Sequence, residues 1–532
     1  MRAVDTRPGP DLRSRCLILT VLLLLAPSLA LQAQERGDTP EHLRTAAEES
    51  DFTRYTSYQE MMDYLDLVRA SSSEVRMGIY GQSWEGRDLP YLVFSRPGVT
   101  RGWEAAALGK PVVELHANVH GGERTLRESL LILIRELATP GTPENALLDD
   151  MVIIVSPQIN PDGFEASPRA TRGNAWGIDM NRDYMKLEQP SIIHWVNNVL
   201  HEWNPHLFVD GHNGGQFPYN LKYQCPGHAD PDQRITQMCD DEIFPRIDER
   251  LEAEGFRSFF WASGNEERWS GGQTDARISR NYAGFANAIG ILFESPSWQE
   301  MDEGVRAGYL AFLATLEYVR DNPERVMGTV AEARRDAVLL GSEPSGEVAV
   351  EMDVEPEDEL VDYLIGGEDR EIIEVTGAPI YKRPVATLTR PRPYAYILPR
   401  DAAEAVDLLK RHNITVEMLR DTVTLEVDAY ELTGVSYDQI YNHQAATNVE
   451  VGEVVTIERT FPAGTYVVPT GQMMGRVATH LLEPETRDNL IYWGTMDRWL
   501  PLAALEDEGD DPVLIPIYKL MRPSALPGRI MN

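Results

Sequence analysis

The sequence predicts an α/β fold with a mixed, largely parallel sheet flanked by helices, followed by a β-rich C-terminal module. Within residues 45–335, short apolar runs alternate with stretches whose apolar residues have helical spacing. Strands and helices that alternate in this way form a sheet covered by helices. Near Arg335 the composition shifts, and Ser342 to Glu374 is acidic and rich in Gly, Pro and Val. This shift predicts a second module over residues 336–532.

Length, charge and the N-terminal segment limit the class of protein. A chain of 532 residues is too long for one ordinary core, and its net charge of -35 argues against nucleic acid as a partner. Residues 1–33 resemble a secretory signal, with four arginines, an apolar run from Cys16 to Leu31, and small residues at Ala30 and Ala33. No later segment is long and apolar enough to span a bilayer. We therefore expect a secreted or periplasmic protein that leaves the membrane after signal cleavage.

The secondary structure of the first part follows from its apolar spacing. Helices are expected over residues 51–71, 124–137 and 304–326. Buried strands are expected over residues 111–119, 151–155, 207–209 and 289–293.

The second part is expected to contain one or two β-rich subdomains without a catalytic constellation. One helix is expected at residues 402–412. Short strands are expected at residues 395–399, 415–419, 422–427, 453–461, 464–469 and 477–484.

Polar side chains that could bind a metal or take part in catalysis follow the four predicted strands. His120, Asn160, His212 and Glu294 each stand at or just after the end of an apolar run, and Glu123 lies three residues beyond His120. In α/β sheets ligands bind at the carboxyl ends of the strands. Imidazole and carboxylate groups are good zinc ligands. An H-x-x-E pair often occurs by chance. Four strand ends that each carry a polar side chain of this kind together predict a metal site.

Five motifs carry a resemblance to a known family. They are His120-Gly-Gly-Glu123, Asn160-Pro-Asp-Gly163, Gly177-Ile-Asp-Met-Asn-Arg182, Asp210-Gly-His212 and Phe293-Glu294. In this order and spacing they resemble the catalytic domain of the zinc metallocarboxypeptidases, the family of carboxypeptidases A, B and T, over residues 50 to 330. The C-terminal module is similar to extensions on some bacterial members.

The resemblance implies a role for each matching residue. His120, Glu123 and His212 would hold one zinc ion per chain, and Asp179 would steady His120 through its other ring nitrogen. Glu294 would be the general base. Asn181 and Arg182 would bind the terminal carboxylate of a peptide, since an arginine offers a bidentate fork.

Five points stay open. Either Arg172, which we favour, or Arg169 would stabilise the oxyanion, and either Tyr282 or Trp269 would form an aromatic lid over the substrate. Gly121 and Gly122 precede Glu123, whereas the pancreatic-type enzymes carry an arginine immediately before the glutamate. His116 is expected to be a core residue or to support a ligand. Cys225 and Cys239 are expected to be either a disulfide or two free thiols.

These expectations together predict an exported zinc carboxypeptidase. It would hydrolyse the C-terminal bond of a peptide with a zinc-bound water that Glu294 activates. One alternative is a zinc amidase or peptidase that acts on peptidoglycan stem peptides or acyl-amino acids. A second alternative is an inactive peptide-binding module. The sequence does not indicate the preferred terminal side chain or the oligomeric state.

Overall fold

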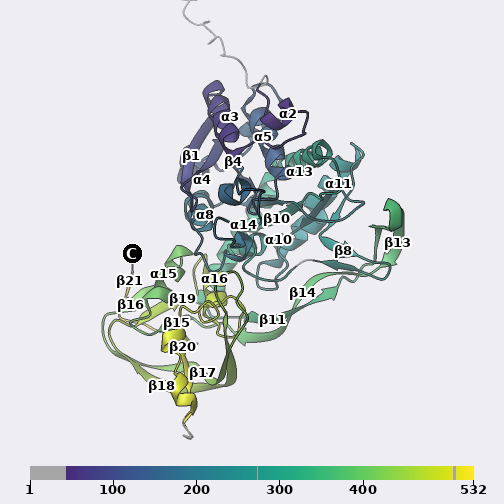
Figure 1. Ribbon diagram of the computed structural model, residues 1–532. Coiled ribbons are helices and arrows are strands. Elements are labelled where there is room, and N and C mark those ends of the chain that lie inside the picture. Colours follow the sequence, from purple (N-terminus) through teal and green to yellow (C-terminus); the bar gives the residue numbers. More distant parts are fainter. Residues whose placement is uncertain (1–42, 272, 507–510, 532) are drawn as a thin grey trace, which may run out of the picture.

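A computed structural model describes residues 43–271, 273–506 and 511–531 of the chain (Figure 1). The signal sequence expected at residues 1–33 lies outside the described residues. Within the described part, no helix is both long and apolar enough to cross a membrane.

An eight-stranded mixed sheet forms the centre of the first part, with the order β1-β2-β4-β3-β5-β10-β6-β7. Its middle strands β4, β3, β5 and β10 are parallel, whereas β1, β2 and β6 each run antiparallel to a neighbour. The mixed, largely parallel sheet expected from the sequence is thus confirmed. The strands are β1 (Val75–Gln82), β2 (Asp88–Phe94), β3 (Val112–Ala117), β4 (Val152–Ser156), β5 (Leu207–His212), β6 (Leu221–Gln224), β7 (Ser258–Phe260) and β10 (Ile289–Glu294).

Both faces of this sheet are buried, which explains why its central strands are apolar runs without alternation. In β5, Leu207 and Val209 contribute to the core on one face, and Phe208 contributes to the core on the other. The helices of the first core include α3 (Tyr58–Ser71), α5 (Thr125–Ala138), α11 (Phe244–Glu252) and α13 (Met301–Asp321). The second core includes α8 (Pro190–Trp195) and α12 (Ser279–Phe285), and it continues into the C-terminal part.

The C-terminal part contains a seven-stranded sheet with the order β18-β17-β20-β15-β19-β16-β21. Leu398 of this sheet belongs to the same core as Phe208 of the first part, so the C-terminal part packs on one face of the central sheet. The elements are β15 (Ala395–Leu398), α15 (Ala403–Arg411), β16 (Glu417–Leu419), β17 (Val423–Tyr437), β18 (Thr447–Phe461), β19 (Tyr466–Pro469), α16 (Gly475–Leu482), β20 (Leu514–Leu520) and β21 (Gly528–Ile530).

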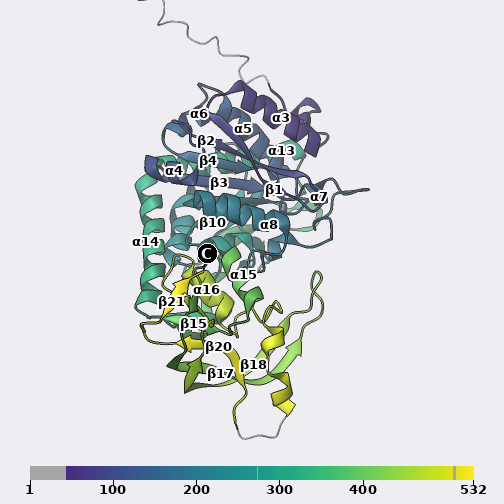
Figure 2. The same ribbon diagram turned by 90° about the vertical axis from the view of Figure 1, so that its left-hand side faces the viewer.

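Helix α14 (Pro323–Ser342) joins the two parts and runs along the side of the molecule (Figure 2). It crosses residue 335, and the division of the chain at that residue stays a prediction. The long strands β11 (Glu347–Pro356) and β14 (Ile380–Pro391) form an arm whose β14 pairs with β9 (Trp269–Gly271), which in turn pairs with β8 (Ala262–Gly264). The hairpin of β12 (Val361–Gly366) and β13 (Ile372–Ala378) lies at the end of this arm (Figure 1).

The strand predicted at residues 477–484 is wrong, because this segment forms helix α16. Val477, Ala478, Leu481 and Leu482 fit one helical face, and every residue of the helix is buried. A short apolar run buried on all sides does not distinguish a helix from a strand by its period. The predicted helix at residues 402–412 is present as α15.

Cys225 and Cys239 form a disulfide between the end of β6 and the helical segment after α10 (Gln233–Met238). The bridge closes a loop with a sequence separation of 14 residues. Of the two alternatives left open by the sequence, the structure has the bonded form.

A buried histidine joins the two parts and predicts a pH effect on stability. His412 accepts a hydrogen bond from the Tyr282 hydroxyl (2.8 Å) and contacts the carbonyl of Met185 (3.0 Å). Burial lowers the pKa of His412 to about 3. Because the unfolded chain gains this proton near pH 6.5 and the folded chain does not, stability is lost as the pH falls below 6.5.

When the pH falls from 6.5 to 5, we expect the free energy of unfolding to decrease by about 2 kcal/mol less in His412→Gln than in wild type. Buried carboxyls act in the opposite direction, since burial raises the pKa of Asp183 to about 7, so the comparison between variants is the informative measurement. Urea unfolding at both pH values measures the difference. His443→Gln, which removes an exposed histidine, is the control. Equal pH dependence in wild type and His412→Gln would contradict the prediction.

Candidate metal centre

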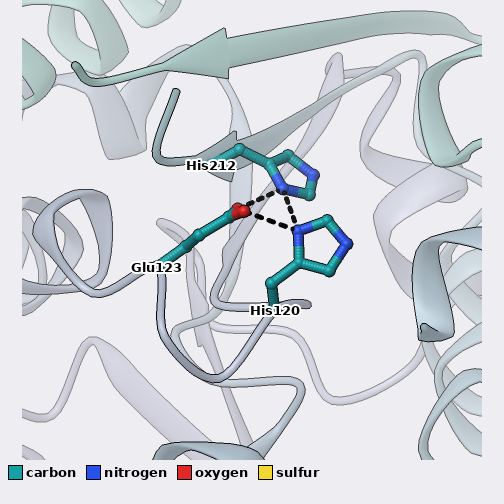
Figure 3. Close-up of side chains that lie close together, drawn as sticks. All are labelled: His120, Glu123 and His212. Carbon is teal, nitrogen blue, oxygen red and sulfur yellow. Dashed lines mark hydrogen bonds and ion pairs between the residues drawn. The ribbon is translucent and has the colours of Figure 1, made fainter. Parts of the chain in front are cut away.

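Three side chains with metal-ligating atoms meet at the carboxyl edge of the central sheet (Figure 3). His120 and Glu123 lie in the loop between β3 and α5, and His212 is the last residue of β5. The Nδ1 atom of His120 lies 2.9 Å from Glu123 Oε1, and that of His212 lies 2.7 Å from Glu123 Oε2. The two Nδ1 atoms are 3.1 Å apart. The structure thus brings together the three residues that the sequence predicted as ligands.

This donor set fits a zinc ion. Tetrahedral ligands about 2.0–2.2 Å from zinc lie roughly 3.3 Å from one another, close to the separations of the three donor atoms. Two histidines and one carboxylate are also the ligand types that a catalytic zinc prefers. Burial alone would raise the pKa of Glu123, but the neighbouring His120 and His212 hold it below its ordinary value.

Each histidine is oriented by a carboxylate on its other ring nitrogen. His120 Nε2 lies 2.9 Å from Asp179 Oδ1, and His212 Nε2 lies 2.7 Å from Asp210 Oδ2. A proton held on Nε2 by these carboxylates leaves the lone pair of each Nδ1 atom free to bind a metal ion. Burial opposes the charge of Asp179 and Asp210, yet the histidines keep the pKa of both carboxyls below the ordinary value.

A buried polar chain extends behind His212. Asp210 Oδ1 lies 3.2 Å from His116 Nε2, and His116 Nδ1 lies 2.8 Å from Glu114 Oε2. His116 is the strand partner of Asp210 across β3 and β5, so it supports the candidate ligand His212 indirectly, through Asp210. Asp210 and Glu114 were missed as site residues. The period-two spacing of Glu114 and His116, beside Asp210 and His212, was the signal for them.

We expect Asp210→Asn to weaken zinc affinity by about 10- to 100-fold, because it removes the anion that fixes the His212 ring. Competition with a chromophoric chelator measures the affinity. Asp248→Asn is a matched control, since Asp248 accepts hydrogen bonds from Tyr223 and Ser258 instead of contacting the site. Zinc affinity in Asp210→Asn equal to that of the control would show that Asp210 does not support the ligand.

The loop between His120 and Glu123 is held by amide side chains. Asn118 Nδ2 donates to the carbonyls of His120 (3.0 Å) and Glu123 (2.8 Å), and Asn160 Nδ2 donates to the carbonyl of Val119 (3.1 Å). A Cβ at Gly121 would lie 2.1 Å from the backbone of Gly163, so only glycine fits there. A Cβ at Gly122 would meet nothing nearer than 3.8 Å, which leaves room for a side chain at this position.

Glu294 ends β10 directly beside the metal ligands. It is the strand partner of His212 and is 8% exposed. A Cβ at Gly214 would lie 2.5 Å from Glu294 Oε2, so the glycine leaves space for the carboxylate. Burial raises the pKa of Glu294, while the charges of His212 and Arg280 lower it.

Arg172 contacts the ligand triangle, the name used here for His120, Glu123 and His212. Arg169, the other candidate for stabilising the oxyanion, does not. The Nη1 atom of Arg172 lies 3.1 Å from Glu123 Oε1, and its Nε atom lies 3.0 Å from Asp179 Oδ2. Half of its side chain is exposed. Within the described part of the chain, the exposed Arg169 makes no hydrogen bond or ion pair. This geometry favours Arg172 over Arg169.

Asn181 and Arg182 lie next to the triangle. Asn181 Nδ2 is 3.3 Å from His212 Nε2, and its Oδ1 accepts from the backbone of Ser279 (2.9 Å). Arg182 donates to the carbonyl of Asn181 (2.8 Å) and to Gln273 Oε1 (3.2 Å). Among the described residues, no carboxylate lies within ion-pair distance of Arg182. Its charge is therefore available to an anion.

Neither predicted lid residue is placed to cover a substrate. Tyr282 is fully buried in helix α12, and its hydroxyl contacts His412. Trp269 is 1% exposed and packs against Tyr219 and Phe259. The resemblance implied an aromatic lid at Tyr282 or Trp269, but all residues of α12 are buried between the sheet and the C-terminal part. A buried ring cannot close over a ligand, so this placement speaks against the prediction for both residues.

Comparison with known proteins identifies the region that contains this site. Residues 61–254, which include His120, Glu123 and His212, match the model of the zinc carboxypeptidase family, M14. Carboxypeptidase 2 of Trichophyton tonsurans is 26% identical over 445 residues, which cover 78% of this chain and 79% of that protein. Carboxypeptidase Z of Rattus norvegicus is 34% identical over 146 residues, which cover 25% of this chain and 22% of that protein.

The solved structures that match include carboxypeptidases. One from Pseudomonas aeruginosa, in complex with (2-guanidinoethylmercapto)succinic acid, covers 51% of this chain and 70% of its own at 20% identity, with a TM-score of 0.41. Carboxypeptidase A from Helicoverpa armigera covers 60% of this chain and 80% of its own at 18% identity, with a TM-score of 0.40. Residues 61–254 thus match the zinc carboxypeptidase family, and the relatives that match over most of the chain are carboxypeptidases.

Proposed function

We propose that the protein is an exported, zinc-dependent carboxypeptidase that hydrolyses the C-terminal bond of peptides. The observation that carries the proposal is the arrangement at one edge of the sheet. His120, Glu123 and His212 form a ligand triangle, and Glu294 is the strand partner of His212. Beside them lies Arg182, which has no carboxylate partner in the described part of the chain. This set combines metal ligands, a base and an anion-binding group.

Each residue has a proposed task. A zinc ion held by His120, Glu123 and His212 would polarise the scissile carbonyl and lower the pKa of a water molecule. Glu294 accepts a proton from the attacking water and returns it to the leaving amine nitrogen. Its burial raises its pKa, which makes its carboxylate a better proton acceptor.

Charged and amide groups orient the substrate in this proposal. Arg172, whose guanidinium is half-exposed beside Glu123, stabilises the negative charge that develops on the carbonyl oxygen. Arg182 and Asn181 bind the terminal carboxylate, and this contact restricts cleavage to the last peptide bond. Asp179 and Asp210 hold the histidine rings in place.

Export is proposed on two grounds. Residues 1–33 have the composition of a secretory signal. The Cys225–Cys239 disulfide fits an oxidising compartment, that is, a secreted or periplasmic location. N-terminal sequencing of the protein from the extracytoplasmic fraction tests this point, and a chain that still begins at Met1 would contradict signal cleavage.

The direct test of the activity uses the purified chain. We expect one zinc ion per chain by elemental analysis, and release of single C-terminal residues from a peptide panel. Peptides with a C-terminal amide are the control, because they lack the carboxylate that Arg182 binds. A chelator should abolish release, and added zinc should restore it. Activity on muropeptides but not on peptides would select the stem-peptide alternative, whereas absence of zinc and of cleavage would reject the proposal.

A further inference from the structure

A hairpin of the C-terminal part reaches the candidate metal centre. Its tip is the segment 438–446, between strands β17 and β18. Asn442 Oδ1 accepts a hydrogen bond from the backbone N–H of Asp179 (3.2 Å), the residue that orients His120. Gln444 Oε1 accepts from Lys186 Nζ (2.7 Å), and His443 Nε2 lies 2.9 Å from Glu188 Oε2. Three consecutive tip residues thus contact Asp179 and the segment that follows it.

The tip has a defined shape. The backbone N–H of Tyr441 donates to the carbonyl of Gln444 (3.0 Å), and Asn442 adopts the left-handed conformation with φ 57°. Asparagine tolerates this conformation better than most residues. Gln444 Nε2 also donates to the carbonyl of Trp493 (2.8 Å). These contacts flank Tyr441 and fix its position, although its side chain is 44% exposed.

A cavity of about 410 Å³ is lined both by Arg182, which lies next to the candidate metal centre, and by Tyr441 of the tip. Two further aromatic residues of the C-terminal part, Tyr492 and Trp493, line it as well. The two other arginines of the lining are already paired, Arg277 with Asp488 at 3.0 Å and Arg487 with Asp275 at 3.2 Å. Arg182, which has no such partner among the described residues, is the cation left to bind an anion there.

The cavity is complementary to the end of a peptide. An unpaired arginine suits a carboxylate, and the partly exposed ring of Tyr441 offers an apolar surface beside it. The carboxylate of Asp438 also lines the cavity, and within the described chain no cation pairs with it. This negative charge disfavours an acidic side chain at the same place. A large apolar C-terminal residue is the ligand that fits these features.

We infer that the segment 438–446 forms one wall of the substrate site, and that Tyr441 packs against a large apolar C-terminal residue whose carboxylate Arg182 binds. This inference rests on the proposed function for the role of Arg182. It assigns the C-terminal part a task in substrate specificity, which explains why a tip more than 250 residues away in sequence contacts Asp179.

The test compares Tyr441→Ala with Tyr437→Ala, which removes an exposed tyrosine of the same hairpin that does not line the cavity. Binding is measured by calorimetry on the zinc-loaded full chain in a Glu294→Gln background, with peptides that end in Phe or Gly. We expect Tyr441→Ala to weaken binding of the Phe peptide by about 10-fold, the size of one lost aromatic contact. The Gly peptide and the Tyr437→Ala control should change by less than about 2-fold. In the active chain, KM for the Phe peptide should rise correspondingly.

The outcomes separate the inference from the proposed function. Equal binding in Tyr441→Ala and Tyr437→Ala, or an equal loss for the Phe and Gly peptides, would overturn the inference, even if wild type releases C-terminal residues. A wild type that binds peptides but releases nothing would reject the proposed function, and the binding comparison would still decide on Tyr441. Unfolding midpoints establish that each variant is folded, and Tyr441→Ser is a second variant if the alanine is not.

Discussion

Replacing Glu294 with glutamine is expected to lower kcat by about 10²- to 10⁴-fold, the range for loss of a general base. The amide has nearly the same shape as the carboxylate, so the space beside Gly214 stays filled. It cannot accept a proton from water, and it cannot return one to the leaving amine. Zinc content and peptide binding should stay close to wild type, because Glu294 is outside the ligand triangle.

Three measurements separate loss of chemistry from loss of structure. They are zinc content, peptide affinity by calorimetry and single-turnover cleavage, each on wild type and Glu294→Gln. Glu303→Gln, an exposed substitution in the first turn of α13, is the matched control and should cleave at the wild-type rate. Cleavage by Glu294→Gln at the rate of this control would show that another group is the base.

The position of Glu294 was predictable from the sequence because the site is built on strand ends. Parallel strands present their carboxyl ends at one edge of the sheet, so His212 and Glu294, each ending an apolar run, were expected at the same edge, and the pairing of β5 with β10 makes them neighbours. His120 and Glu123 follow β3 in the same way. Residue type and position were therefore sufficient to predict a metal site at the strand ends and the mixed sheet, whereas the choice of ligands and the role of Glu294 came from the family resemblance.

Features that depend on long-range packing were not predictable. Tyr282 was expected near the substrate, but helix α12 is buried against the C-terminal part, and His412 contacts the tyrosine from 130 residues away. The contact between Asn442 and Asp179 joins residues 263 positions apart. No local period encodes such contacts, because the residues that cover an element lie elsewhere in the chain. The segment of α16 was misassigned for a different reason: its apolar residues have helical spacing, but the run is so short that it was interpreted as a strand.

Arg182 is the residue on which selectivity for the end of a peptide should depend. It already donates to the carbonyl of Asn181 and to Gln273, which fixes its guanidinium, and no carboxylate of the described residues neutralises it. We expect Arg182→Met to lower kcat/KM for free-acid peptides by on the order of 30- to 5,000-fold, equivalent to about 2–5 kcal/mol for a buried charge pair that loses one partner. Arg182→Lys keeps the charge but loses the fork, so its loss should be intermediate.

The measurement compares each free-acid peptide with its C-terminal amide. Wild type should prefer the free acid strongly, and Arg182→Met should lose most of that preference while keeping its zinc. Arg101→Met, which removes an arginine with 65% of its side chain exposed at the start of α4 (Gly102–Leu108), should keep the wild-type preference. A mutation that merely loosened the site would slow both peptides equally and leave their ratio unchanged. An unchanged ratio in Arg182→Met would therefore assign the terminal carboxylate to another cation of the site.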